Sequence, residues 1–274
     1  MTLSYFGTAA AEGVPSVFCN CRLCREAREL KGRNIRTRSQ ALVNDDLLID
    51  LPPDTYMHYL TYGFNLPDIT ELLVTHSHTD HFYATELEMR CEPLAYPRPP
   101  LMHIYCNEAV ERKFHKFMPS TYHVEDNFAL VCAAPFVPLS IKGYSVVPLL
   151  ANHDKAEECL LYLVTEGNKT ILYGNDSGIF PEATFSYLKD RGLHIDLASF
   201  DCTLQSWREG SNHMGLEDVV ETRERLQKAG VIDDGTISVL THFSHNGLWS
   251  CAKMEEEAAK RGFIAAYDGL VVEV

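Results

Sequence analysis

Three histidines and one aspartate lie within six consecutive positions, because residues 76–81 read His-Ser-His-Thr-Asp-His. In an extended strand the side chains at positions i and i+2 point to the same side, so His76 and His78 can bind one metal ion where a strand ends. If the chain turns there, Asp80 and His81 can reach a second ion nearby. Imidazole and carboxylate groups suit divalent zinc, manganese or iron. The spacing therefore predicts a metal site rather than a polar loop that is rich in histidine.

A second cluster of metal-binding residue types consists of Cys19, Cys21 and Cys24. Three thiolates at this spacing suit a tetrahedral structural zinc that needs one further ligand, although one reactive or several buried cysteines would give the same pattern. The chain has nine cysteines in all. Their odd number argues against a disulfide framework, so we expect metal binding by some of them and burial of the others.

The composition is that of an acidic globular protein. The 274 residues carry a formal net charge of −14, with 46% hydrophobic and 23% charged residues. This charge disfavours nucleic acid as a partner, although two bound divalent ions would make the site locally positive and able to hold an anion. No apolar run approaches the roughly 20 residues of a membrane helix. The first ten residues lack signal-peptide features. We therefore predict a cytoplasmic protein without membrane association.

One basic segment stands out in this acidic chain. Its cationic residues are Arg22, Arg25, Arg28, Lys31, Arg33, Arg36 and Arg38. They could form a phosphate-attracting rim or the solvated face of a helix, and the sequence leaves both interpretations open.

The pattern of apolar runs and turn residues predicts an α/β chain. Strands are expected at residues 2–6, 40–43, 47–51, 71–74, 102–106, 131–132, 144–150, 160–164, 170–173, 195–200, 237–240 and 270–274. Helices are expected at residues 24–30, 55–62, 83–91, 215–229 and 250–261. Ser211 or Asn212 is the expected N-cap of the fourth helix. Two strand-rich halves with helices between them predict two sheets packed face to face with helices outside, as a single domain over residues 1–274.

Single polar residues recur where the predicted strands end. They are His76, His78, His153, Asp176 and His242. Taken singly, such a residue is usually a cap or a surface group, but together with Asp80 and His81 they supply enough ligands for two ions and a bridging carboxylate. Two ions about 3.5–4 Å apart can hold a bridging hydroxide and stabilise both sides of an in-line displacement at phosphorus. Asp50, at another strand end, would orient a ligand histidine or cap a loop.

In order, residue type and context, this ligand series resembles that of the metallo-β-lactamase superfamily. The resemblance implies a four-layer αββα sandwich with the site along one edge of its sheets. It also makes Asp80 a catalytic residue. The implied ligands are His76, His78 and His153 for the first metal, Asp80, His81 and His242 for the second, and Asp176 as the bridge.

Further motifs resemble the cyclic phosphodiesterases of the carbon–phosphorus lyase pathway, within the same superfamily. They span nearly the whole chain: Gly7-Thr8-Ala9, Glu12-Gly13-Val14-Pro15, Cys19-x-Cys21-x-x-Cys24, Asn152-His153-Asp154-Lys155, Asp201-Cys202, Asn212-His213, Thr241-His242-x-Ser244-His245 and Tyr267-Asp268-Gly269.

This narrower resemblance implies roles for two more histidines. His245 would be the fourth ligand of the structural zinc, beside the three cysteines. His213 would act as general acid or stabilise the transition state; alternatively, it only accompanies a helix cap. Because His242 and His245 share one short loop, the zinc would brace the loop that presents an active-site ligand. The implied zinc ligands are Cys19, Cys21, Cys24 and His245.

The activity implied is that of a dinuclear metal-dependent phosphodiesterase with two divalent active-site ions (manganese, zinc or iron) and one structural zinc. A metal-bridging hydroxide would attack phosphorus in a small cyclic phosphodiester. By resemblance this substrate is 5-phosphoribosyl 1,2-cyclic phosphate of phosphonate metabolism, opened to ribose 1,5-bisphosphate. The resemblance also suggests a homodimer.

Three other functions are compatible with this fold. A tRNA 3′-processing endonuclease shares the ligand set, but the chain has no long basic arm to grip tRNA. A thioester or lactam hydrolase would use the same metals to activate water. A non-catalytic cofactor-biosynthesis or binding protein would keep the fold and the cysteine zinc, but the complete ligand set argues against it.

Overall fold

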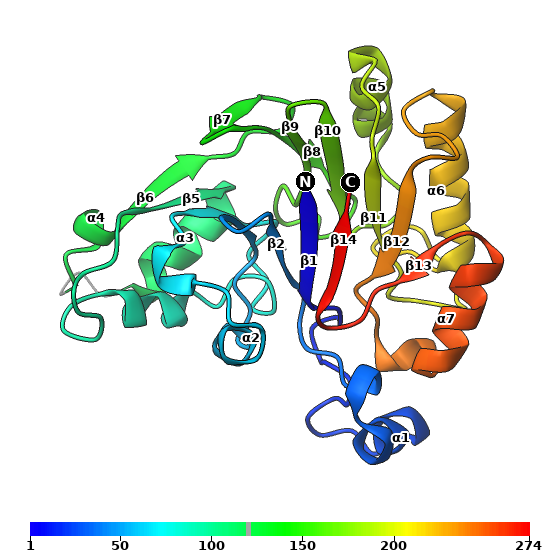
Figure 1. Cartoon of the computed structure of the whole chain (residues 1–274), viewed down its shortest axis with the longest axis horizontal. Coiled ribbons are helices and arrows are strands. Elements are labelled where there is room, and N and C mark those ends of the chain that lie inside the picture. The colour runs from blue at the N-terminus through cyan, green and yellow to red at the C-terminus, as the bar shows by residue number, and fades with distance from the viewer. Residues whose placement is uncertain (119–121) are drawn as a thin grey trace.

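The computed structural model describes residues 1–118 and 122–274, and its strands form two seven-stranded sheets (Figure 1). The first has the order β14-β1-β2-β3-β4-β5-β6 and the second the order β13-β12-β11-β10-β9-β8-β7. The strands of the first sheet are β1 Thr2–Gly7, β2 Gln40–Val43, β3 Leu47–Ile49, β4 Glu71–Leu73, β5 Met102–Cys106, β6 Phe128–Cys132 and β14 Leu270–Glu273. Those of the second are β7 Leu139–Ile141, β8 Tyr144–Leu150, β9 Leu160–Glu166, β10 Lys169–Gly174, β11 Leu197–Asp201, β12 Ile237–Thr241 and β13 Ile264–Ala265.

Helices cover the outer faces of both sheets. In Figure 1, α2 and α3 lie on the side of the first sheet, and α5, α6 and α7 on the side of the second, with α1 below the sheets. The α-helices are α1 Arg22–Leu30, α2 Thr55–Tyr62, α3 Glu108–Phe117, α4 Val124–Asn127, α5 Glu182–Arg191, α6 Leu216–Lys228 and α7 Cys251–Lys260. Short 3₁₀ helices span Gly32–Asn34, Leu66–Asp68, Ala84–Arg90 and His245–Gly247.

The core consists of three apolar layers. Leu73 and Tyr162 pack between the two sheets, whereas Leu72, the neighbour of Leu73, packs under the helices of the first sheet. A third cluster around Phe200 lies between the second sheet and its helices. Because central strands are buried on both faces, they read as apolar runs rather than as strict alternation. Each fully buried leucine contributes about 1.5–3 kcal/mol. The predicted αββα sandwich is confirmed.

The sheet topology brings the predicted site residues to one edge. Strands β10, β11 and β12 are parallel neighbours, and β8 runs in the direction of β10 because both are antiparallel to β9. Their carboxyl ends therefore meet at one edge, which is where α/β sheets place their sites. Asp50, Asp176 and His242 have positive φ angles of 66°, 55° and 61°. Such strained backbone in residues other than glycine clusters at functional sites.

The predicted N-cap of the fourth helix is wrong. Helix α6 begins at Leu216, and its N-cap is Gly215, whose backbone N–H donates to Asp218 Oδ2 at 3.1 Å. A β-carbon at Gly215 would lie 1.6 Å from the carbonyl oxygen of Trp207, so only glycine fits there. Ser211 and Asn212 lie in the preceding loop.

Helices α3, α4 and α5 and strands β7 and β13 were not predicted, and the helix predicted at residues 83–91 is the 3₁₀ helix Ala84–Arg90. In α3 the only buried residues are Val110 and Phe114, so its apolar pattern is too short to recognise. Its N-cap is Asn107, whose side chain accepts a hydrogen bond from the backbone of Val110 at 2.9 Å. Within residues 1–118 and 122–274, no helix has the length and apolar character needed to cross a membrane.

Candidate metal centre

Seven side chains converge at the carboxyl ends of the strands and form two overlapping groups of ligand atoms. Within each group the ligand atoms all lie within 4.8 Å of one another. Asp176 belongs to both groups, as a bridging carboxylate must. One group is His76, His78, His153 and Asp176, and the other is Asp80, His81, Asp176 and His242.

The first group combines buried and open ligands. His76 Nε2 lies 3.3 Å from Asp176 Oδ2, and both side chains are buried. His78 Nδ1 lies 3.2 Å from His153 Nε2. The His78 side chain is 42% exposed, so this side of the first group opens to solvent.

The second group is almost completely buried. His81 Nε2 lies 2.9 Å from Asp176 Oδ2, 3.2 Å from Asp80 Oδ2 and 3.3 Å from His242 Nε2. A substrate can therefore approach the pair of groups from the side of His78 rather than from that of His81.

Hydrogen-bond partners outside the ligand groups determine which ring nitrogen of His81 and of His242 faces the metal site. His81 Nδ1 lies 2.7 Å from a carboxylate oxygen of Asp50, and His242 Nδ1 lies 2.8 Å from Thr203 Oγ1. A Nδ1–H that donates to such a partner leaves Nε2 free to bind a metal. Asp50 thus has the orienting position that the sequence left open, whereas Thr203 was not identified. The only feature of the sequence that could have indicated Thr203 is its position two residues after Asp201, the aspartate that ends β11.

The electrostatics of the groups fit divalent cations. Burial holds the pKa of His76 well below its ordinary value. Burial favours the neutral form of Asp176, but the neighbouring imidazoles, His242 first, hold its pKa well below the ordinary range. Across the part of the chain that the structure describes, His76 Nε2 and Asp176 Oδ1 are buried without a hydrogen-bond partner. Neutral imidazole beside ionised carboxylate, with unsatisfied buried acceptors, is the environment that a divalent metal site requires.

His213 lies beside the shared carboxylate, as its predicted role requires. Its Nδ1 is 3.1 Å from Asp176 Oδ1 and 3.0 Å from Asp201 Oδ2. Although burial favours neutral imidazole, these carboxylates raise the pKa of His213 to about 11. Burial raises the pKa of Asp201, but His213 outweighs it and brings that pKa to about 2. The sequence analysis did not assign Asp201, a fully buried aspartate at the end of β11.

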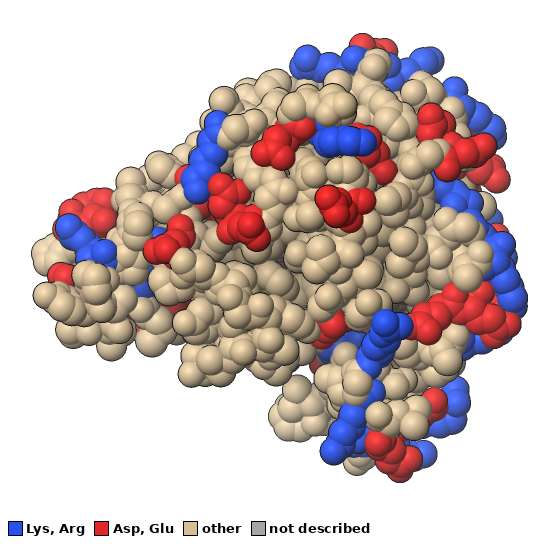
Figure 2. Space-filling model, in the orientation of Figure 1, with Lys and Arg blue, Asp and Glu red and all other residues tan. Residues whose placement is uncertain are grey.

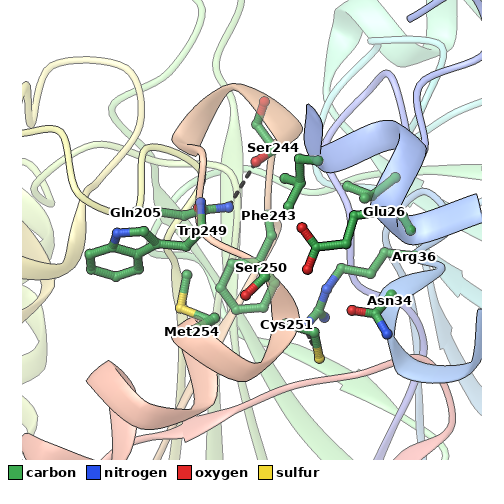
Figure 3. A pocket seen from close by; sticks show the side chains of 13 residues that line it. Glu26, Asn34, Arg36, Gln205, Phe243, Ser244, Trp249, Ser250, Cys251 and Met254 are labelled. Atoms are coloured by element: carbon green, nitrogen blue, oxygen red, sulfur yellow. Dashed lines mark hydrogen bonds between the residues drawn. The ribbon is translucent and has the colours of Figure 1, made fainter. Parts of the chain in front are cut away.

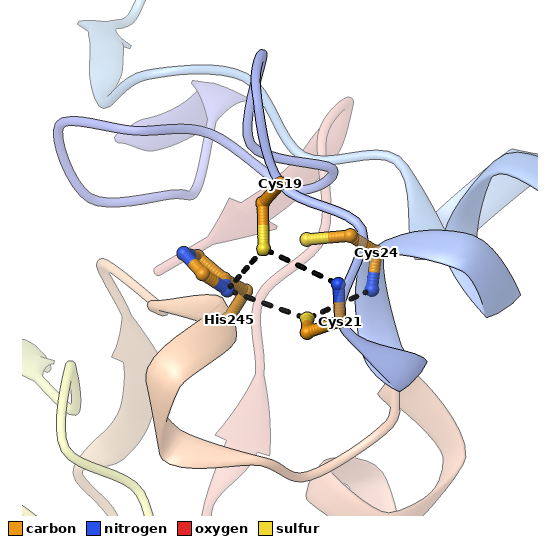
Figure 4. Close-up of side chains that lie close together, drawn as sticks. All are labelled: Cys19, Cys21, Cys24 and His245. Atoms are coloured by element: carbon orange, nitrogen blue, oxygen red, sulfur yellow. Dashed lines mark hydrogen bonds between the residues drawn. The ribbon is translucent and has the colours of Figure 1, made fainter.

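The side chains of Cys19, Cys21, Cys24 and His245 come together, as Figure 4 shows. His245 Nδ1 lies 3.7 Å from Cys19 Sγ and 3.6 Å from Cys21 Sγ. Cys21 is also the N-cap of α1, and its Sγ accepts a hydrogen bond from the backbone N–H of Cys24. Burial opposes ionisation of Cys21, but this bond and the neighbouring His245 lower its pKa to about 6. Three sulfurs and one imidazole nitrogen within 4.8 Å of one another suit a structural zinc.

The loop that joins His242 to His245 is held from below by Gln205 (Figure 3). Gln205 Nε2 donates to the carbonyl of Ser244 at 2.7 Å, and its Oε1 accepts from the backbone of Trp249 at 2.8 Å. The cavity in Figure 3 holds only about 20 Å³, room for one water molecule and not for a substrate.

We expect purified protein to contain up to three metal ions per chain, one of which resists mild chelation. The resistant ion is the thiolate-bound zinc, because soft sulfur ligands hold zinc more firmly than imidazole and carboxylate do. Metal analysis before and after treatment with dilute chelator measures this. Complete removal of all metal by dilute chelator would contradict the assignment of the cysteine site.

The basic residues of the N-terminal segment differ in exposure: Arg22, Arg25, Arg28, Lys31 and Arg33 are exposed, whereas Arg36 is buried and Arg38 half-buried. Figure 2 shows blue side chains over the α1 region at the lower end of the molecule. Arg28 donates to the carbonyl of Cys19. Arg36 is buried and donates to the carbonyl of Ala266, and Arg38 pairs with Asp54 at 2.9 Å. The rim interpretation therefore receives no support from Arg36 and Arg38.

An open cavity of about 450 Å³ adjoins the exposed edge of the first group. Lys155 is the one cation that lines it, and within residues 1–118 and 122–274 this side chain forms no ion pair. The cavity is lined by His78, His153, Asp154, Lys155, Ser211 and Asn212. The carbonyl of Asn212 lies 3.2 Å from His153 Nδ1, so this loop also orients a ligand histidine.

Several solved structures share this fold over their full length. A diphosphatase from the PhnP family has a TM-score of 0.74 at 23% identity, with 100% of this chain and 97% of that chain covered. Zinc-bound PqqB from Methylobacterium extorquens has a TM-score of 0.70 at 19% identity, with 100% of both chains covered. The short form of human tRNase Z has a TM-score of 0.68 at 16% identity, with 100% and 99% covered. At these identities the likeness shows the fold.

Sequence comparison identifies the family. An octanoyltransferase from Porphyromonas gingivalis is 29% identical over 159 residues, which are 54% of this chain and 30% of that protein. The chain thus spans less than a third of that relative's length. Residues 47–243, which contain all seven ligands of the two groups, match the β-lactamase superfamily domain. This protein therefore belongs to the metallo-β-lactamase superfamily and carries a buried cluster of His and Asp side chains that could hold metal ions.

Proposed function

We propose that this protein is a dinuclear metal-dependent phosphodiesterase acting on a small cyclic phosphodiester. The substrate that the sequence resemblance favours is 5-phosphoribosyl 1,2-cyclic phosphate, which would be opened to ribose 1,5-bisphosphate. The observation that supports this best is the placement of His213 within 3.1 Å of the carboxylate that the two ligand groups share. A proton donor next to a metal pair suits cleavage of a phosphodiester, whose leaving alkoxide needs a proton.

In the proposed reaction, the metal ions and the side chains around them have different roles. When bound, two divalent ions supply an activated water and neutralise the charge on phosphoryl oxygens. Asp201 accepts the Nδ1–H of His213 and so keeps the ring protonated and fixed. Nε2 of His213 is then the nitrogen that protonates the leaving alkoxide. Asp50 and Thr203 keep His81 and His242 in the orientation that catalysis needs.

An activity screen with defined metals tests the substrate class. Purified protein loaded with manganese or zinc is incubated with a cyclic sugar phosphate, a linear nucleotide diester, a precursor tRNA and a thioester. We expect the highest kcat/KM on the cyclic phosphate. Preferred cleavage of precursor tRNA or of the thioester would replace the proposal with the corresponding alternative. The cytoplasmic location and the homodimer stay predictions, and light scattering of purified protein tests the homodimer.

Replacing Lys155 with methionine should raise KM about tenfold for substrates that carry a second phosphate, with little change in kcat. A hydrogen bond to a charged group is worth about 1.5–3 kcal/mol, and this lysine lines the cavity beside the metal groups. Bis-p-nitrophenyl phosphate has no second phosphate and should be cleaved equally by both proteins. Lys228→Met, a change on the exposed face of α6, is the control. An equal rise in KM for both substrates would show that Lys155 does not recognise the second phosphate.

A further inference from the structure

Ser77 lies between two histidines of the first ligand group, in a bend of the loop that follows β4. Glu157 holds it there. One carboxylate oxygen of Glu157 accepts a hydrogen bond from Ser77 Oγ at 2.7 Å, and both oxygens lie within 3.2 Å of the Ser77 backbone nitrogen. Charge-assisted bonds of this kind are about twice as strong as neutral ones. They fix the backbone from which His76 and His78 project.

Lys113 holds the same residue from the other side. Its Nζ donates to the carbonyl of Ser77 at 2.6 Å and to Thr79 Oγ1 at 3.1 Å. Lys113 lies on α3, and the N-cap of this helix, Asn107, donates from Nδ2 to Glu157 at 3.0 Å. The N–H and the C=O of Ser77 are therefore both bound to charged side chains, and α3 anchors both contacts.

Glu157 also belongs to the loop between β8 and β9 that carries His153. It thus joins the two segments that supply all three imidazoles of the first group. The His78 side chain is 42% exposed and so is not held by burial; besides the backbone contact through Ser77, its Nε2 lies 3.2 Å from Asp154 Oδ2. The second group has different supports: His81 is held by Asp50, and His242 by Thr203.

We propose that Glu157 and Lys113 are positioning residues that set the spacing of His76, His78 and His153 and so control the affinity of the first metal. This inference rests on the proposed two-metal site. Loss of an outer partner of a metal ligand costs about 10–100-fold in metal affinity. Glu157 has no hydrogen bond to a ligand of the second group, and Lys113 reaches that group only through Thr79, the neighbour of Asp80, so the affinity of the second site should change less than that of the first.

Calorimetric titration of Zn²⁺ into chelator-treated full-length protein tests the proposal. The Asp80→Ala background leaves the first site, and the His78→Ala background leaves the second. Glu157→Gln is added to each, because its amide NH₂ faces the donors that the carboxylate accepted. We expect about 10–100-fold weaker zinc binding in the first background and little change in the second. Lys113→Met should also weaken zinc binding at the first site more than at the second. Lys116→Met, which changes an exposed residue of α3, should weaken neither.

Three outcomes would overturn the inference. Equal weakening at both sites would show a general structural role, and unchanged binding at both would show no role. If Glu157→Gln does not fold, the zinc affinities of the two sites are compared in Lys113→Met instead. Equal affinity changes at both sites in that variant would also overturn the inference. The protein without these substitutions is titrated first. If it binds no zinc beyond the cysteine site, the proposed function fails together with this inference. If it binds two ions and the variants show no bias, the inference alone fails.

Discussion

Asp80→Ala should reduce phosphodiester hydrolysis at least about 10³-fold while the fold persists. Asp80 is the charged ligand that belongs to the second group alone, and its Oδ2 lies 3.2 Å from His81 Nε2. Removing it takes one anionic ligand from the second metal, and loss of one preorganised charge-stabilising contact already costs about 10²–10³ in kcat. Steady-state kinetics on bis-p-nitrophenyl phosphate and far-UV circular dichroism measure the two effects.

The matched control for this variant is Asp45→Ala. Asp45 is an exposed aspartate in the turn between β2 and β3, so it tests the general effect of losing one carboxylate. We expect wild-type turnover from the control. Substantial turnover of Asp80→Ala with a native spectrum would reject Asp80 as a metal ligand.

His213→Ala should lower kcat about 10²–10⁴-fold, the range in which general acid–base catalysis contributes. Metal content should fall less than kcat, because His213 belongs to neither of the two ligand groups assigned to the metals, although it forms a third candidate group with Asp176, Asp201 and His242. The variant leaves Asp201 without its imidazole partner, so some loss of stability is also expected. Metal analysis and kcat are measured on the same preparation.

Two comparisons separate catalysis from structure for this residue. His194→Ala, which removes a half-exposed histidine near Asp233, should leave both kcat and metal content unchanged. Loss of metal from His213→Ala in proportion to the loss of kcat would make His213 a ligand or a structural residue. A substrate with a better leaving group, such as a nitrophenolate ester, should be affected less, because its leaving oxygen needs no proton.

The sequence was sufficient to predict which side chains come together in the two groups, because polar residues follow its strands and the series resembles that of a known superfamily. Asp176 has no local motif of its own, but parallel strands bring their carboxyl ends to one edge. A polar residue after a buried apolar strand is therefore informative about tertiary position. The same reasoning gave the two sheets, whose central strands are apolar on both faces. It failed for α3, which buries only two apolar residues.

The outer contacts could not be predicted, because they depend on distances across the fold. Glu157 and Ser77 are separated by 80 residues in the chain. Ser77 is a variable position within the histidine motif, and Glu157 belongs to no motif. Asp201 was noted only as part of a motif after a strand, without a role, and its contact with His213 depends on the loop before α6. That loop was misread, since its serine and asparagine resemble helix caps while a glycine contact with Trp207 places the actual cap three residues later than Asn212.

The central claim is that two adjacent metals make this chain a phosphodiesterase, and manganese titration of turnover tests it most directly. Active-site metal is removed with chelator, manganese is returned in known amounts, and hydrolysis of bis-p-nitrophenyl phosphate is followed at each step. We predict no turnover after chelation and recovery that is complete when two ions per chain have bound. A protein that keeps its native fold and binds two ions, yet shows no turnover with manganese, zinc or iron, would contradict the claim.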